Sequence, residues 1–210
     1  MTRIVAGSAK GRTLAVPKSG TRPTSERVRE ALFSRLDHMN VLEGATVLDL
    51  FAGTGALGLE ALSRGAARAT LVEKASAAAR VVSANVRATG LPARVVTADV
   101  RAYLGARSGE ALMGENDLVF IDPPYDIPEG DMTTVLSALA PWVGPDSLIV
   151  VERSTRAPAP TWPPFLVLED TRAWGETVAY FAGPPLPKDE ESSDAAERAA
   201  ASPVCEETAP

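Results

Sequence analysis

From about residue 45 onward, short β-branched segments alternate with longer segments of helical character. Such alternation predicts parallel strands joined by crossover helices, because each helix returns the chain to begin the next strand in the same direction. The chain is therefore expected to form a doubly wound, Rossmann-like α/β sheet. The strand-like segments are residues 46–50, 69–72, 94–97, 118–121 and 148–151, and the helix-like segments between them are 56–63, 76–88, 100–104 and 132–139.

The last strand-like segments depart from this pattern. Residues 165–168 and 177–181 have strand character, and only a short turn region separates them. A connection this short joins antiparallel strands, since parallel neighbours need a crossover of a dozen or more residues. We therefore expect an α/β fold with a seven-stranded, mostly parallel sheet that ends in an antiparallel hairpin. One main core is expected for 210 residues of which 45% are hydrophobic.

The two ends of the chain differ in charge. Residues 1–36 contain eight basic and two acidic residues, and they predict a β-hairpin followed by a helix that begins near residues 24–26. Residues 188–210 contain seven acidic and two basic residues, with few large apolar side chains to offset their ordering entropy. We interpret residues 1–36 as a basic arm that binds nucleic-acid phosphates, 37–182 as the main domain and 183–210 as an acidic disordered tail.

Several classes of protein are not expected from this composition. No apolar stretch is long enough for a transmembrane helix, and the N-terminus lacks the apolar region of a signal peptide. The single cysteine, Cys205, and the single histidine, His38, do not cluster with other thiols or imidazoles. We expect a cytoplasmic monomer with no membrane segment, no disulfide and no metal site.

A glycine-rich loop follows the first predicted strand and leads directly into a helix. Gly53 and Gly55 permit a tight turn in which backbone N–H groups approach a ligand, and Gly58 lets the helix pack close to the strand. Glu73, twenty residues after Gly53, can accept hydrogen bonds from ribose hydroxyls. These glycines match the pattern G-x-G-x-x-G, so a nicotinamide-dependent oxidoreductase is one candidate function.

Asp49 favours a different ligand. It stands four residues before Gly53, at the end of the first predicted strand. A carboxylate there suits a ligand with an ammonium group beside a sulfonium better than it suits a pyrophosphate. Asp99, at the end of the third predicted strand, can accept a hydrogen bond from an adenine amino group, and it can equally serve as a helix N-cap. S-adenosylmethionine is therefore the expected cofactor.

The segment Asp122-Pro123-Pro124-Tyr125 follows an apolar strand, at the end where open α/β sheets bind their ligands. The Asp122 carboxylate and the Pro123 carbonyl can accept both hydrogens of an exocyclic amino group, so that the nitrogen lone pair faces a methyl donor. Tyr125 can stack on a base swung out of its helix. These residues therefore indicate methylation of a nucleobase amine, with geometry supplying most of the rate. The structural alternative is an Asx-turn acid, a strand ended by prolines and a packed aromatic ring.

Further motifs stand before the first predicted strand. They are Arg3-Ile4-Val5-x-Gly7 with Gly11-Arg12-x-Leu14, and Arg22-Pro23-Thr24-x-x-Arg27-Val28-Arg29-Glu30-x-Leu32-Phe33. Together with the glycine loop and Asp122 to Tyr125, they make residues 3–182 resemble the bacterial small-subunit ribosomal RNA guanine-N2 methyltransferases of the RsmD type. Ala6 is one departure, because the family more often has a second glycine there.

This resemblance implies a substrate, a cofactor and roles for particular residues. The substrate would be N2 of one guanine in 16S rRNA, within the small ribosomal subunit or its assembly intermediate. Thr24 would line the cofactor or base pocket. The cofactor S-adenosylmethionine would contact Asp49, Phe51, Gly53, Gly55, Glu73 and Asp99, the base would be held by Asp122, Pro123, Pro124 and Tyr125, and RNA phosphates would be bound by Arg12, Arg22, Arg27 and Arg29.

Two further alternatives keep the same fold. The Asp-Pro-Pro-Tyr segment also occurs in methyltransferases of adenine in DNA, so N6 of adenine in DNA or RNA is an alternative substrate. A catalytically silent RNA-binding module is the other. The intact acid and aromatic ring of Asp122 and Tyr125 give that module no support.

Overall fold

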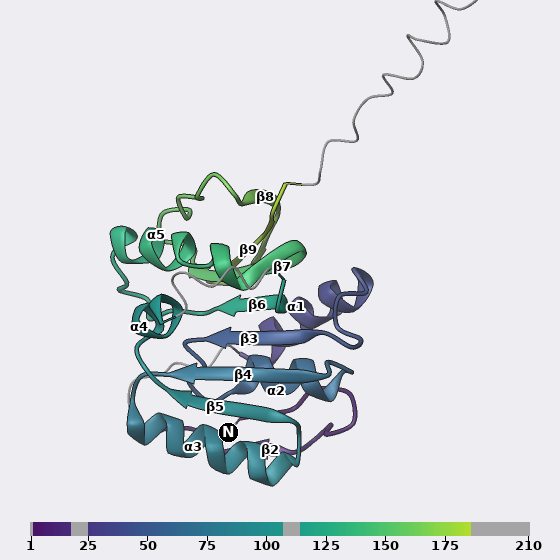
Figure 1. Ribbon diagram of the computed structural model, residues 1–210. Helices are drawn as coiled ribbons and strands as arrows, with labels where there is room; N and C mark the ends of the chain where they lie inside the picture. The colour runs from purple at the N-terminus through teal and green to yellow at the C-terminus, as the bar shows by residue number, and fades with distance from the viewer. Residues whose placement is uncertain (1, 18–24, 107–113, 186–210) are drawn as a thin grey trace, which may run out of the picture.

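The computed structural model describes residues 2–17, 25–106 and 114–185. Its centre is a seven-stranded sheet with the strand order β5-β4-β3-β6-β7-β9-β8 (Figure 1). Strands β3 to β7 are parallel to one another, and β9 is antiparallel to both β7 and β8. The strands are β3 (Thr46–Leu50), β4 (Arg68–Glu73), β5 (Ala93–Thr97), β6 (Asn116–Ile121), β7 (Val143–Ser154), β8 (Val167–Trp174) and β9 (Thr177–Gly183).

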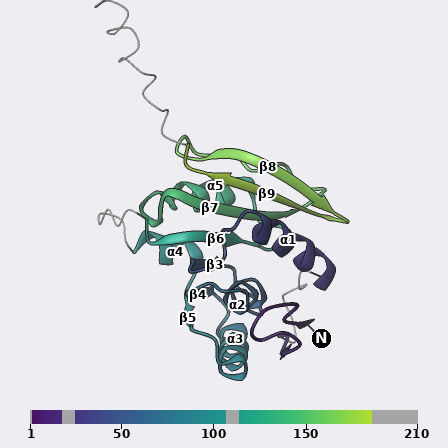
Figure 2. The same cartoon turned by 90° about the vertical axis from the view of Figure 1, so that its right-hand side faces the viewer.

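Helices cover both faces of this sheet (Figure 2). One buried cluster joins residues of α1, α2 and α3 to alternate residues of the strands, including Val47, Phe120 and Val150. A second cluster joins α4 and α5 to the intervening strand residues, such as Leu48 and Ile121. Burial on both faces explains why these strands are continuous apolar runs in the sequence. The helices are α1 (Glu26–His38), α2 (Ala56–Ser63), α3 (Ser76–Thr89), α4 (Val100–Gly105) and α5 (Glu129–Ser137), with a short 3-10 turn η1 (Ala140–Trp142).

The direction of the crossovers reverses between β3 and β6. The chain passes from β3 to β4 and β5 on one side, and it then returns to form β6 and β7 on the other side of β3. The carboxyl ends of these two adjacent strands are therefore the switch point at which open α/β sheets bind ligands. Asp49 lies near the end of β3, and Asp122 directly follows β6.

The predicted α/β fold with a terminal hairpin is confirmed. The hairpin strands β8 and β9 are longer than the predicted segments, and β9 inserts between β7 and β8. The N-terminal hairpin is also present, as β1 (Thr2–Arg3) paired with β2 (Thr13–Leu14). Helix α1 begins after the N-cap Ser25, whose hydroxyl accepts a hydrogen bond from the Val28 N–H at 3.2 Å.

The N-terminal hairpin is fastened to helix α2 by buried polar contacts. Glu60, which is fully buried, accepts hydrogen bonds from the backbone N–H groups of Val5 and Ala6 at 2.7 and 3.0 Å. On the next turn, Ser63 Oγ accepts a hydrogen bond from the Ala9 N–H at 2.9 Å. Asn85 of α3 bridges the carbonyls of Ala15 and Thr54. The arm is therefore packed against the same helix that leaves the glycine loop.

The described residues contain neither a candidate membrane span nor a candidate metal site. None of their helices is long and apolar enough to cross a membrane. Within the described ranges, no group of histidine, cysteine and acidic side chains could hold a metal ion. The predicted acidic tail lies largely outside the described residues, which end at position 185.

Candidate functional site

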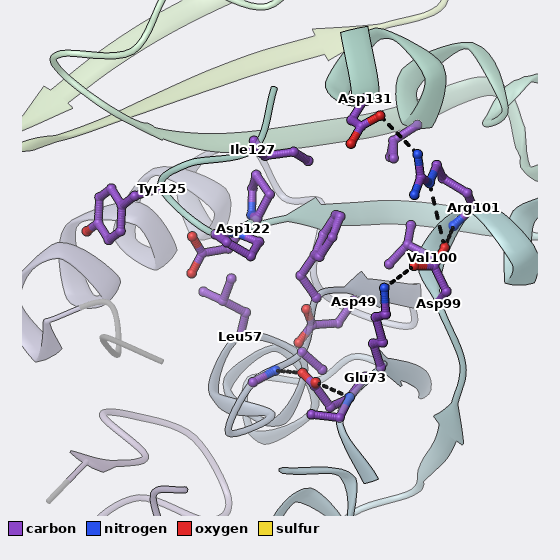
Figure 3. Close-up of a pocket in the computed structure, with 18 of the residues that line it drawn as sticks. Asp49, Leu57, Glu73, Asp99, Val100, Arg101, Asp122, Tyr125, Ile127 and Asp131 are labelled. Carbon is purple, nitrogen blue, oxygen red and sulfur yellow. Dashed lines mark hydrogen bonds and ion pairs between the residues drawn. The ribbon is translucent and has the colours of Figure 1, made fainter. Parts of the chain in front are cut away.

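A cavity of about 700 Å³ opens at the carboxyl ends of β3, β4 and β6 (Figure 3). This volume lies within the range of typical small-molecule sites, about 300–1,000 Å³. The glycine loop forms its floor, and the Asp-Pro-Pro-Tyr segment forms one wall. The lining residues are Asp49, Phe51, Ala52, Gly53, Thr54, Ala56, Leu57, Glu73, Lys74, Ala75, Asp99, Val100, Arg101, Asp122, Pro123, Pro124, Tyr125, Asp126, Ile127, Pro128, Asp131 and Val135.

The glycine loop has the backbone that its sequence predicts. Gly55 has φ of +77° and is the N-cap of α2, so a side chain there would be strained. A Cβ added to Gly58 would lie 2.3 Å from Leu71 Cδ2, which shows that α2 packs directly on β4. Phe51 is one of two non-glycine residues with positive φ among those described, at +66°. Strained backbone of this kind is concentrated at ligand sites.

Asp49 carries an oxygen with no hydrogen-bond partner among the described residues. Its side chain is buried, and Oδ2 accepts a hydrogen bond from the Gly58 N–H at 3.0 Å. Its other oxygen, Oδ1, is buried and unsatisfied. Burial raises the pKa of Asp49 from 3.8 to about 7, although the Gly58 N–H opposes that shift, and the nearby charges of Asp122 and Glu73 raise the pKa further. A cationic group in the cavity would satisfy Oδ1 and stabilise the carboxylate.

Glu73 holds the loop as well as lining the cavity. Its Oε2 accepts a hydrogen bond from the Gly53 N–H at 2.9 Å, and its Oε1 accepts one from the Ala75 N–H at 2.8 Å. Each carboxylate oxygen has a second lone pair, so both can still accept hydrogen bonds from ligand hydroxyls. Glu73 therefore fits the predicted role beside a ribose.

Asp99 is a helix N-cap, one of the two roles weighed for it. Its Oδ1 accepts hydrogen bonds from the N–H groups of Arg101 and Ala102 at 3.0 and 3.4 Å. Lys74 Nζ lies 3.0 Å from Asp99 Oδ2, and its hydrogen bond is the main cause that lowers the pKa of Asp99. Because Asp99 also lines the cavity, its role as a cap is compatible with the predicted contact to a cofactor.

Sequence reasoning missed the charged rim beside Asp99. Arg101 Nη1 donates a hydrogen bond to Asp131 Oδ1 at 2.9 Å, which links α4 to α5 at the edge of the cavity (Figure 3). Lys74 directly follows Glu73, and Arg101 follows the cap by two residues. The positions of Lys74 and Arg101 just after strand ends could have indicated that they line the cleft. The partners of these two residues, by contrast, belong to other elements and could not be read from the local sequence.

The Asp-Pro-Pro-Tyr segment forms the outer wall of the cavity. A hydrogen bond from the Ile127 N–H to the Pro124 carbonyl, 3.1 Å long, closes the turn after the two prolines. Tyr125 is 57% exposed, which is high for a large aromatic residue and leaves its ring face accessible. The structure thus brings Asp122 and Tyr125 to the cavity that contains Asp49. A packed Tyr125, which the structural alternative requires, is not observed.

The predicted RNA-binding residues differ in their exposure to solvent. Arg12 and Arg27 are exposed, and Arg12 also donates a weak 3.5 Å hydrogen bond to the Ala88 carbonyl. Arg22 and Thr24 lie outside the described residues. The assignment of Arg29 to RNA phosphate is wrong, because its side chain is fully buried.

Arg29 instead ties α1 to the hairpin and to α2. It donates hydrogen bonds to the Thr2 hydroxyl, at 3.0 Å, and to the Arg3 carbonyl. Its Nε lies 3.7 Å from Glu60 Oε2. Burial lowers the pKa of Arg29, and the charges of Glu60, Glu26 and Glu152 oppose that shift. Arg29 is thus a structural cation within the arm.

Comparison with known families gives one match that covers almost all of the described chain. The family model described as "Conserved hypothetical protein 95" matches residues 2–183. The chain belongs to this family. The resemblance to the RsmD type is confirmed by a relative from Escherichia coli strain K12, "Ribosomal RNA small subunit methyltransferase D", with 40% identity over 180 residues, 85% of this chain and 87% of the relative.

Other relatives and solved structures agree with this membership. The protein of the same name from Haemophilus influenzae is 34% identical over 160 residues, which cover 74% of this chain and 80% of that protein. The solved structure "Putative methyltransferase yhhF from Escherichia coli" superposes with a TM-score of 0.74 and 35% identity, covering 89% of this chain and 99% of that one. The predicted class I methyltransferase fold is therefore confirmed.

Proposed function

We propose that this protein transfers a methyl group from S-adenosylmethionine to N2 of a guanine in small-subunit ribosomal RNA. The observation that carries the proposal is one cavity that contains both the buried, unsatisfied Asp49 oxygen and the exposed Tyr125 beside Asp122. A cation-binding end and a base-stacking end in the same cavity fit a methyl donor and a methyl acceptor. The relatives named as ribosomal RNA small subunit methyltransferases support the choice of RNA.

The residues of the inner part of the cavity fit S-adenosylmethionine. Asp49 Oδ1 would accept a hydrogen bond from the ammonium group, and Glu73 would accept from the ribose hydroxyls, because its oxygens retain free lone pairs. Asp99 would hold the adenine amino group from the rim. Phe51, Gly53 and Gly55 complete this set as the backbone of the loop. Bound there, S-adenosylmethionine supplies an electrophilic methyl group on its sulfonium.

The outer wall holds the target base. Tyr125 stacks on the flipped purine, and stacking of this kind contributes about 1–3 kcal/mol, similar to what flipping costs. The Asp122 carboxylate and the Pro123 carbonyl accept the two amino hydrogens, while Pro124 keeps the segment rigid. The nitrogen lone pair then points into the cavity toward the methyl group. This positioning provides most of the rate, since no strong base is needed before the methyl group transfers.

The basic arm would contribute cations that bind the RNA. Arg12 and Arg27 are exposed on the arm and are available for phosphates. Arg22 and Thr24, which lie outside the described residues, are assigned to RNA binding by the sequence resemblance alone. We place the substrate in the small subunit or its assembly intermediate, where the arm would contact rRNA phosphates.

A transfer assay tests this proposal. Small subunits from a strain that lacks the enzyme are incubated with the protein and S-adenosylmethionine labelled on its methyl group. Label at one guanine of 16S rRNA is expected. Label on an adenine, or on DNA alone, would refute the proposed substrate and favour the adenine alternative.

A further inference from the structure

A small recess adjoins the main cavity behind the Asp-Pro-Pro-Tyr wall. It shares Asp122 to Tyr125 with the main cavity and adds four residues from β7 and β9, and its volume is about 20 Å³. That volume accepts about one water-sized group, so the edge of a base can reach into it and a whole ring cannot. The four added residues are Glu152, Arg153, Ser154 and Thr177.

Strand register places Glu152 beside Asp122. Phe120 pairs with Val150 and Ile121 with Val151, so the next position along β7, Glu152, lies next to Asp122. Side chains alternate between the two faces of a strand, and Glu152 therefore shares the face of Val150, which packs in the cluster with α1 and α2. Both carboxylates thus border the recess from adjacent strands.

The Glu152 side chain is buried, whereas the side chain of its neighbour Arg153 contacts α5 on the other face of the sheet. The residue Glu152 is 4% exposed. Arg153 Nη1 donates a hydrogen bond to Glu129 Oε2 of α5 at 3.2 Å. The charge of Glu152 acts on buried Arg29 of α1, which places a cation within electrostatic reach of this carboxylate. A nearby cation offsets part of the cost of burying a carboxyl group, whose oxygens are hydrogen-bond acceptors.

We propose that Glu152 reads the identity of the base by accepting the ring N1–H of guanine while Asp122 and Pro123 hold the 2-amino group. This inference rests on the proposed function and assigns a specificity-determining residue to it. Guanine presents N1–H and the 2-amino group as adjacent donors, so two adjacent carboxylates match that edge. Adenine presents an unprotonated N1, whose lone pair would face the Glu152 carboxylate. A site built around a hydrogen bond rejects a base that leaves it unpaired.

The base 2-aminopurine isolates this contact. It keeps the 2-amino group that receives the methyl group, but its N1 is an acceptor and it lacks O6. Small subunits are reconstituted with 16S rRNA that carries either guanine or 2-aminopurine at the position methylated by the wild-type protein. The ratio of the two kcat/KM values is measured for the wild type, Glu152→Gln and Glu129→Gln. Glu129 is the matched control, because it is a β7-contacting carboxylate on the opposite face of the sheet.

The wild type should prefer guanine by about 10- to 100-fold, the usual discrimination from one well-placed set of base hydrogen bonds. Glu152→Gln should reduce that ratio by about tenfold or more, since the Gln amide can donate to N1 of 2-aminopurine. Glu129→Gln should keep the wild-type ratio. S-adenosylhomocysteine binding by calorimetry checks that each variant is folded.

Three results would count against the proposal. If the wild type gives nearly equal kcat/KM values for guanine and 2-aminopurine, the protein does not recognise N1–H, and this result alone excludes the proposal. A folded Glu152→Gln protein with the wild-type ratio assigns Glu152 a purely structural role beside Arg29. If the wild type methylates no guanine in natural subunits, the proposed function itself fails, and this inference fails with it.

Discussion

The buried carboxyl of Asp49 is expected to lower folding stability in exchange for cofactor affinity. Burial raises its pKa from 3.8 to about 7. At about 1.4 kcal/mol per pKa unit, keeping this group ionised in the folded chain above pH 7 costs at most about 4 kcal/mol. The Asp49→Asn variant has no charge to bury. Its free energy of unfolding at pH 8 should therefore exceed that of the wild type by up to about 4 kcal/mol.

The sign of this effect follows from proton binding. Because the folded-state pKa of Asp49 lies above the unfolded value, the folded chain binds more protons between roughly pH 4 and pH 7. This group therefore makes wild-type stability fall as pH rises through that window. The difference between the variant and the wild type should be small at pH 4 and reach its full size at pH 8. Urea denaturation at the two pH values measures it.

The same substitution should weaken cofactor binding. Removal of a charged acceptor costs about 1.5–3 kcal/mol, which corresponds to a roughly 10- to 100-fold loss of affinity for S-adenosylhomocysteine. Calorimetry at pH 8 measures that loss. The exposed carboxyl of Asp146 on β7 provides a control, and Asp146→Asn should change neither quantity. The reasoning is refuted if Asp49→Asn gains no stability between pH 4 and pH 8 and binds the ligand as tightly as the wild type.

Three further results are expected. Asp122→Ala should lower kcat by a factor of about 100 to 1,000 while S-adenosylhomocysteine affinity is unchanged, and a parallel loss of affinity would place Asp122 in the cofactor site instead. If Arg12 and Arg27 contact phosphates, Ala substitution of each should make the slope of log affinity for small subunits against log salt shallower by about 0.7–0.9, and an unchanged slope would remove that residue from the interface. Glu60→Gln should destabilise the protein by about 3–5 kcal/mol in urea, because it leaves Arg29 buried without its ion-pair partner, and a loss below about 1 kcal/mol would contradict that role for the pair.

Much of the fold follows from local patterns in the sequence. The apolar runs that became β3 and β6 are buried on both faces, and few other elements accommodate such runs. Gly58 and Asp49 are only nine residues apart, on either side of the glycine loop, so their contact is encoded locally. The position of the cavity at the ends of β3 and β6 could likewise be predicted from the sequence, although its shape could not.

Other features depend on partners that are distant in the chain. Arg29 looks like one more exposed cation of the arm, and only its packing against Glu60 of α2 shows that it is buried. The sequence predicts a strand that ends at Val151, whereas β7 continues to Ser154 and carries Glu152 to the recess. The insertion of β9 between β7 and β8 is likewise a choice of tertiary pairing that local pattern does not specify.

The identity of the methylated nucleoside tests the central claim most directly. Small subunits that lack the modification are treated with the protein and S-adenosylmethionine, and the 16S rRNA is then digested and analysed by mass spectrometry. The account predicts one N2-methylguanosine per subunit with the wild-type protein and none with Asp122→Ala. A methylated adenosine, or an unmodified rRNA in the presence of a protein that binds the cofactor, would contradict it.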